Sequence, residues 1–168
     1  MAKVKNAKTD KERVTIAFRE AGHAVMAWNR GILVEPLAIK SKRIKFRQNA
    51  WNNPLESLDP DWVKTNRPEK LIHLLALISL AGPAAVRRKN PGGRRDPVYR
   101  ERLENADKLL GTLYDSNGER LEHLQQLEAV ADRMFSRADV WEKIDRLAWN
   151  LLENGSLSED QALEILEK

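Results

Sequence analysis

The chain has 168 residues, of which 42% are hydrophobic and 32% charged, and this is enough to bury a core without covalent staples. It contains no cysteine, which excludes disulfides and thiolate metal sites and favours a cytoplasmic location. The net charge of +4 is too small to indicate nucleic-acid binding by itself, and the longest apolar run, residues 74–81, is too short to span a membrane.

The N-terminal region predicts a short tail followed by a helix. Residues 1–8 are basic, and we expect a disordered tail there and a single domain over 9–168. Thr9 and Glu12 have the spacing of a capping box, so the first helix is predicted to begin at this point. Gly31 is predicted to end it. The apolar stripe of this helix consists of Val14, Phe18, Ala21, Val25 and Trp28.

A short sheet and an apolar helix are expected next. Residues 36–40 and 43–47 alternate between apolar and polar, which predicts a strand pair, and 52–60 is typical of a loop. Pro68 suits the start of a buried central helix. Gly82-Pro83 is expected to kink or interrupt that helix, since proline cannot donate a backbone hydrogen bond.

The rest of the chain has helical patterns. Helices are predicted near residues 98–115, 119–135, 137–154 and 158–167. Ser158 and Gln161 have capping-box spacing at the start of the last one. The expected fold class is therefore mainly α, a helical bundle with a small β-sheet beside the first helix.

Residues 18–25 have the pattern of a zinc-protease helix in which one residue differs. Such a helix carries two histidines four residues apart that bind one metal, and a glutamate after the first histidine acts as general base. Glu20 and His23 stand at the positions of the base and the second ligand, but Arg19 occupies the first ligand position. A guanidinium stays protonated and has no lone pair for a metal.

Three segments of the chain resemble the peptidase domain of FtsH-type ATP-dependent zinc proteases. They are residues 19–25 (REAGHAV), similar to HEAGHAV; residues 80–85 (LAGPAA), similar to LGGRAA; and residues 147–157, similar to the closing helix and turn. The resemblance follows the order of the family from about residue 14 onward. It implies the fold of that domain, with Arg19 and His23 at the floor of its cleft. That family carries an ATPase module and a membrane anchor, and we expect neither in this chain.

The resemblance also implies a position for the third zinc ligand. In the family this ligand is an aspartate in the pattern DLxxA, which is similar to residues 102–106 (RLENA) and places Arg102 at the ligand position. Asp96 and Asp107 are near but out of register, and Val86 stands where the family has a further acidic residue.

We therefore expect no metal cofactor at this site. Arg19, His23 and Arg102 are interpreted as vestigial ligand positions, and Glu20 as a vestigial general base. A divalent cation roughly 4–6 Å from a fixed guanidinium is repelled by several kcal/mol at an effective dielectric of about 20. Our hypothesis is that the two arginines stand where the metal charge stood. Glu20, with Asp96 or Asp107, would then close a buried ion-pair cluster.

Three functions remain open from the sequence. The first is a proteolytically inactive FtsH-like domain that acts as a binding or scaffold protein for a protein or peptide partner. The second is a zinc metallopeptidase with a rearranged site that uses His23, Glu20 and one of Asp96 or Asp107. The third is a small nucleic-acid-associated regulator that uses the basic segments 40–47 and 87–95. We favour the first, so an enzyme and a nucleic-acid partner are not expected.

The remaining histidines are assigned no role, and most tryptophans are interpreted as structural. His73 and His123 lie on other predicted helices, and we give them no function. Trp28, Trp62, Trp141 and Trp149 are interpreted as core or groove-lining residues. The sequence does not indicate an oligomeric state.

Overall fold

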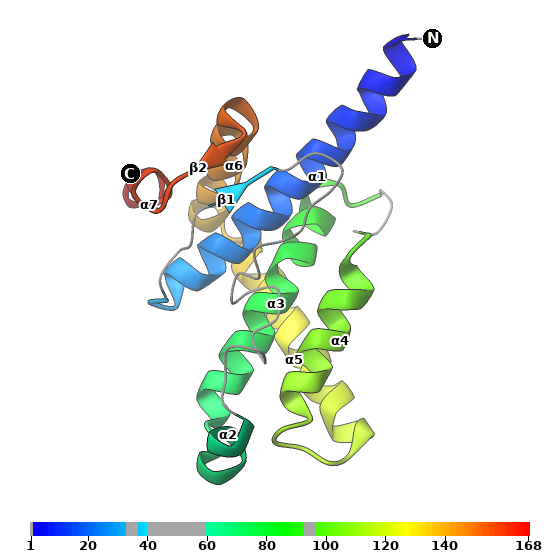
Figure 1. Ribbon diagram of the computed structural model, residues 1–168, viewed down its shortest axis with the longest axis vertical. Helices are drawn as coiled ribbons and strands as arrows, with labels where there is room; N and C mark the ends of the chain where they lie inside the picture. The colour runs from blue at the N-terminus through cyan, green and yellow to red at the C-terminus, as the bar shows by residue number, and fades with distance from the viewer. Residues whose placement is uncertain (1, 33–36, 40–59, 93–96) are drawn as a thin grey trace.

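The computed structural model describes residues 2–32, 37–39, 60–92 and 97–168, and Figure 1 shows their arrangement. The elements are α1 (Ala2–Asn29), β1 (Leu37–Ala38), α2 (Pro60–Asn66), α3 (Glu69–Lys89), α4 (Tyr99–Leu110), α5 (Asn117–Ser136), α6 (Ala138–Asn154), β2 (Ser156–Leu157) and α7 (Glu159–Glu167). The protein is mainly helical with a small antiparallel sheet, which confirms the predicted fold class.

Helix α1 begins earlier than the sequence predicted and ends where expected. It starts at Ala2 and not at Thr9, so residues 2–8, expected as a disordered tail, are helical in the structure. Alanine and lysine favour helix, and no glycine or proline interrupts this segment. At the other end Gly31 has φ +73°, and the amides of Gly31 and Ile32 bond to the carbonyls of Trp28 and Ala27, both at 3.0 Å. These bonds form a Schellman motif.

Helix α3 is the central helix and packs against α1, α4 and α5 (Figure 1). It follows Pro68 directly, as predicted, but continues through Gly82-Pro83 to Lys89 without the expected interruption. The buried side chains on either side of Pro83 hold the helix together, so packing outweighs the lost backbone bond. Of the described helices, α3 alone is long and apolar enough to cross a membrane, and 72% of that stretch is buried inside the protein.

The small sheet joins two distant parts of the chain. Leu37 of β1 pairs with Leu157 of β2, and the amide of Ile39 donates to the carbonyl of Gly155 at 2.8 Å. The predicted partner strand, 43–47, lies outside the described residues. Leu37 and Leu157 are both buried, so the pairing adds two apolar side chains to the core. The sheet lies beside α1, as expected (Figure 1).

The other helices agree with their predicted positions to within a few residues, apart from the short α2, which was not predicted. The capping box of α7 is present: the Gln161 amide donates to Ser158 Oγ at 3.2 Å, and the Ser158 amide donates to Gln161 Oε1 at 2.9 Å.

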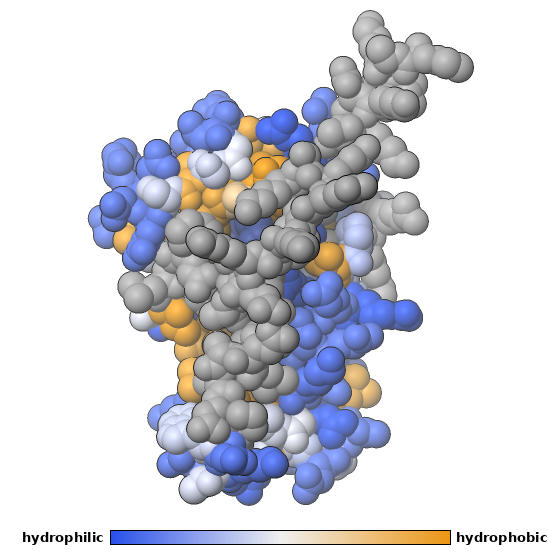
Figure 2. Space-filling view, viewed as in Figure 1, coloured by the Kyte–Doolittle hydropathy of each residue, from blue (hydrophilic) through white to orange (hydrophobic). Residues whose placement is uncertain are grey.

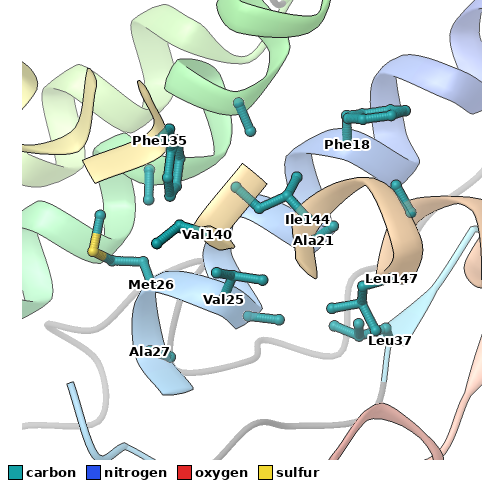
Figure 3. Packing of buried hydrophobic residues seen from close by; sticks show 14 of the residues in the cluster. Phe18, Ala21, Val25, Met26, Ala27, Leu37, Phe135, Val140, Ile144 and Leu147 are labelled. Carbon is teal, nitrogen blue, oxygen red and sulfur yellow. The ribbon is translucent and has the colours of Figure 1, made fainter. Parts of the chain in front are cut away.

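Among the described residues, the core consists of two hydrophobic clusters on either side of α3, whereas hydrophilic residues predominate on the surface over α4 (Figure 2). The first lies between α1, α3, α5 and α6 and includes Phe18, Phe135 and Ile144 (Figure 3). The second lies between α3, α4 and α5 and includes Ile72 and Leu109. The first cluster supports the part of α1 that carries Arg19 and His23.

Candidate functional site

Glycines bring two of the family-like segments into direct contact. A Cβ atom added to Gly22 would lie 2.6 Å from the Cβ of Ala85, and one added to Gly82 would lie 2.3 Å from Nε2 of His23. Real Cβ atoms do not approach other atoms so closely, so α1 and α3 can cross at this distance only because both residues are glycine. Residues 19–25 and 80–85 therefore form one packed unit.

The imidazole of His23 is completely buried in this crossing. Its Nδ1 lies 2.7 Å from the backbone carbonyl oxygen of Ile78. A carbonyl can only accept, so Nδ1 carries the proton and Nε2 has the lone pair. Among the described residues, Nε2 has no hydrogen-bond partner. Metal-binding histidines usually donate their second N–H to a carbonyl or carboxylate in this way, so the ring has the tautomer of a ligand.

Two guanidinium groups from different helices lie near this imidazole. Arg19 of α1 is 4% exposed and Arg102 of α4 is 1% exposed. The pKa of His23 is held well below its usual value, mainly by burial, then by the charge of Arg102 and to a smaller extent by that of Arg19, although the Ile78 carbonyl raises it. The structure thus places the three residues that the resemblance assigns to ligand positions in one buried site, with the imidazole neutral.

Glu20 supplies a negative charge beside the first of these arginines. Its Oε1 lies 3.5 Å from Nε of Arg19, and both side chains are at least nine-tenths buried. The predicted carboxylate–guanidinium pair is therefore present. An Arg19 side chain that faced solvent, with no carboxylate near it, would have contradicted the ion-pair hypothesis; Arg19 is instead buried beside Glu20.

The acidic residues near Arg102 do not extend this pair within the described part of the chain. Asp107 lies one and a half turns along α4, on another face, and its Oδ1 accepts from Nε of Arg120 at 3.0 Å with the Asp107 side chain 44% exposed. Asp96 lies outside the described residues. Val86, which stands where the family has a further acidic residue, is buried in α3.

Sequence reasoning missed two groups at this site. Ser79 is buried, and its Oγ lies 3.5 Å from the carbonyl oxygen of Arg102, which links α3 to α4. The signal was available, because Ser79 is a polar residue within the apolar run 74–81. The carbonyl of Ile78 is a backbone group, so no residue type in the sequence identifies it.

The described residues at this site do not fit a zinc ion. Catalytic zinc needs three protein ligands and an open position. The tautomer of His23 fits, but the two neighbouring positions carry permanently charged arginines that have no lone pair to donate. In the described ranges, no group of three histidine or acidic side chains is arranged to hold a metal.

His73 and His123 lie away from this site, in the second half of the bundle. The hydroxyl of Tyr114 lies 2.9 Å from Nε2 of His73 and donates to Oε1 of Glu69 at 3.1 Å. The rings of His73 and His123 are 5.0 Å apart. Burial, and then the neighbouring His123, lower the pKa of His73, while Glu69 raises it. The geometry is that of a contact that joins helices α3, α5 and the turn after α4.

We compared the chain with models of known protein families and with curated proteins. Neither the models of known protein families nor the curated proteins gave a match to this chain. The resemblance to the FtsH-type peptidase domain is therefore carried by the three quoted segments alone. Two of those segments pack directly on each other, and the third, residues 147–157, belongs to α6 and β2, where α6 packs on α1.

Proposed function

We propose that this chain is a proteolytically silent, FtsH-like peptidase domain that acts as a binding or scaffold protein. The observation that carries the proposal is the pair of buried arginines, Arg19 and Arg102, near the neutral imidazole of His23. A protease site of this type would have metal-binding side chains at those two positions. The His23 tautomer supports descent from such a site, and the arginines support the loss of its ion.

In this proposal the guanidinium groups take over a structural role of the metal. A catalytic ion ties together the helices that carry its ligands, and here Arg19, His23 and Arg102 come from α1 and α4, on either side of α3. The contact of Ser79 with Arg102 connects α3 to α4, and that of His23 with the Ile78 carbonyl connects α1 to α3, both without an ion, while Arg19 pairs with Glu20 within α1. Buried charged networks of this kind fix geometry more than they add stability. In this proposal the edge of the sheet can also hold an extended peptide by strand addition.

The rearranged metallopeptidase is a weaker candidate on the same geometry. It needs Glu20 released from Arg19, and a carboxylate as third ligand. Of the two proposed carboxylates, Asp107 is occupied by Arg120. The nucleic-acid regulator depends on two basic segments: 40–47, outside the described residues, and 87–95, which begins in the last turn of α3 and of which 93–95 also lie outside them. A steep loss of binding to single-stranded DNA with added salt would favour that third function.

Metal content and proteolysis test the proposal together. The wild type, Arg19→His, and Arg19→His combined with Arg102→Asp are purified without chelator, and their zinc content and casein hydrolysis are measured. We expect no stoichiometric zinc and no hydrolysis for the wild type. Arg19→His alone should bind zinc weakly at best, because only two imidazoles are then available. The double variant supplies two imidazoles and one carboxylate, and zinc should bind there if the ancestral geometry persists.

A matched control is Arg30→His, which adds a histidine at an exposed position after α1. It should leave the zinc content unchanged. Stoichiometric zinc or casein cleavage in the wild type would contradict the proposal. Zinc and cleavage in Arg19→His alone would show that a third ligand is still present, against our interpretation of Arg102.

A further inference from the structure

The C-terminal end of α3 borders an open hollow on the surface, and neither of the buried arginines lines it. Its volume is about 600 Å³, and it is lined by Arg87, Arg88, Pro91, Asp132, Phe135 and Trp141. These residues come from α3 and the turn after it, from α5 and from α6. The hollow therefore combines positive charge with aromatic surface at the junction of three helices.

The two arginines in this wall differ in their surroundings. Arg87 is held by carboxylates, with Nη2 2.9 Å from Oδ1 of Asp132 and Nη1 3.7 Å from Oε1 of Glu128. Arg88 is exposed, and its guanidinium carbon lies 5.0 Å from the ring centre of Trp141. Within the described ranges, no carboxylate forms a salt bridge with Arg88. Stacking on an indole orients a guanidinium while its N–H donors remain available.

The aromatic surface below Arg88 is held rigidly by the core. Trp141 stacks on the buried ring of Phe18 at 5.9 Å, and Trp149, which is 44% exposed, meets the same ring edge-on at 6.1 Å. Lys89 adds a second cation, with Nζ 4.4 Å from the ring centre of Phe18 and 3.5 Å from Oδ1 of Asp145. Such a surface is ready to receive an apolar group without losing conformational entropy.

We propose that this hollow binds an acidic peptide segment. One carboxylate of the peptide binds the guanidinium of Arg88, and an adjacent apolar side chain packs on the partly exposed Trp141. A planar guanidinium recognises a carboxylate through two parallel hydrogen bonds. This inference rests on the proposed binding function and names the chemistry of its partner, at a surface distinct from the buried site.

Charge complementarity favours a peptide over a nucleic acid. Asp132, Glu128 and Asp145 place negative charges in and beside the hollow, and these repel a continuous run of phosphates. A peptide carries isolated carboxylates separated by amide groups, so one carboxylate can reach Arg88 while a backbone N–H approaches Asp132. The surface thus matches a ligand of mixed charge and apolar character.

Binding of two peptide pools to the full chain tests the proposal. One pool of short fluorescein-labelled peptides contains Asp, Glu, Leu, Phe and Gly at random, and the other has Asn and Gln in place of Asp and Glu. A single-stranded oligothymidylate is the third probe. Fluorescence anisotropy should show binding of the acidic pool, and the amide pool should bind about tenfold more weakly because the charged hydrogen bonds are lost.

Variants locate the binding site. Arg88→Ala should weaken binding of the acidic pool about tenfold, whereas Arg30→Ala, which removes an exposed arginine just after α1, should leave it unchanged. Trp141→Phe keeps a ring on Phe18 and should remove most of the tryptophan fluorescence change caused by the peptides. Circular dichroism confirms that each variant is folded before its affinity is compared.

Several outcomes would overturn the inference. They are equal binding of the acidic and amide pools, an affinity that Arg88→Ala does not change, absence of binding to the acidic pool, and tighter binding of the oligothymidylate. The last result would assign the hollow to phosphate recognition. None of these results alters the zinc and casein measurements above, so failure of the peptide site is distinguishable from failure of the proposed function.

Discussion

At the scale of single residues, the main electrostatic feature of the buried site is that the imidazole of His23 stays neutral. Burial and the charges of Arg102 and Arg19 all disfavour the imidazolium form. The ring therefore accommodates two guanidinium groups nearby, because it adds no third positive charge. Glu20 offsets the charge of Arg19 from the same helix. The neutral state of one imidazole is thus a condition for burying the arginines.

This neutral imidazole predicts a loss of stability in mild acid. The pKa of His23 is lower in the folded protein than the value of about 6.5 expected for an unfolded chain. As the pH falls below that value, the unfolded chain takes up a proton that the folded protein refuses. The free energy of unfolding should therefore fall by up to about 1.4 kcal/mol per pH unit for this residue. Urea unfolding between about pH 7.5 and 5.5 measures it.

The comparison variant for this prediction is His23→Gln, which has no titrating group and should have a shallower dependence on pH, whatever its absolute stability. Part of the slope should remain, because the pKa of His73 is also lowered in the folded state. His73→Gln should remove that smaller part. A slope that is the same in the wild type and in His23→Gln would show that His23 takes up its proton as readily in the folded protein as in the unfolded chain, against the lowered pKa.

At the scale of elements, the close crossing of α1 and α3 decides what the site contains. The ring of His23 fits against α3 only because residue 82 has no side chain, and the Cγ of Arg19 would also lie 2.7 Å from an added Cβ there. A methyl group at this position must push both side chains away. The same contact places the carbonyl of Ile78 at Nδ1 of His23. Helix packing and the electrostatics of the site are therefore coupled.

Gly82→Ala should destabilise the protein although alanine is the better helix former. The gain in helix propensity is about 1 kcal/mol, but the clash with His23 and Arg19 should outweigh it and give a net loss of about 1–3 kcal/mol. Gly118→Ala is the matched control, since the nearest atom to its added Cβ is 3.7 Å away. It lies in the first turn of α5 and should raise stability by about 0.5–1 kcal/mol. Chemical denaturation compares the two; equal effects would mean that α1 and α3 are not in close contact at Gly82.

The sequence predicted those parts of the fold that are set by local signals. Gly31 and the Ser158–Gln161 capping box marked helix ends correctly, because the turn chemistry lies within a few residues. The path of α3 through Pro83 was not predicted, since packing from other helices decides it. The pairing of Leu37 with Leu157 joins segments far apart in the chain, and no local pattern identifies such a partner.

For the candidate site, the sequence identified which residues belong to it, but not that they are buried or which groups they contact. Arg19 and His23 were found from their spacing, and Arg102 from its register in a family pattern. The burial of all three, and the carbonyl of Ile78 that fixes the His23 tautomer, depend on how α3 packs between α1 and α4. A charged side chain in a sequence is normally expected at the surface, so its burial has to be seen in the structure.

At the scale of the whole molecule, α3 joins the two hydrophobic clusters into one structure. Its C-terminal half packs in the first cluster with α1 and α6, and its N-terminal half packs in the second with α4. The partly buried side chain of Leu127 contacts both clusters from α5. Because one continuous helix contributes to each cluster, loss of packing in one should weaken the other.

This arrangement predicts that cavities in either cluster shift a single unfolding transition. Ile144→Ala in the first cluster and Leu109→Ala in the second each remove a fully buried side chain, and each should cost about 2–5 kcal/mol. Leu121→Ala, at a side chain that is 55% exposed, should change stability by less than about 0.5 kcal/mol.

Tryptophan fluorescence follows mainly the first cluster, where Trp28 and Trp141 pack, whereas circular dichroism follows all helices. The two signals should give coincident urea curves in every variant. A fluorescence curve that stays at the wild-type midpoint in Leu109→Ala, while the circular dichroism signal is lost earlier, would mean that the halves unfold independently and that α3 does not couple them.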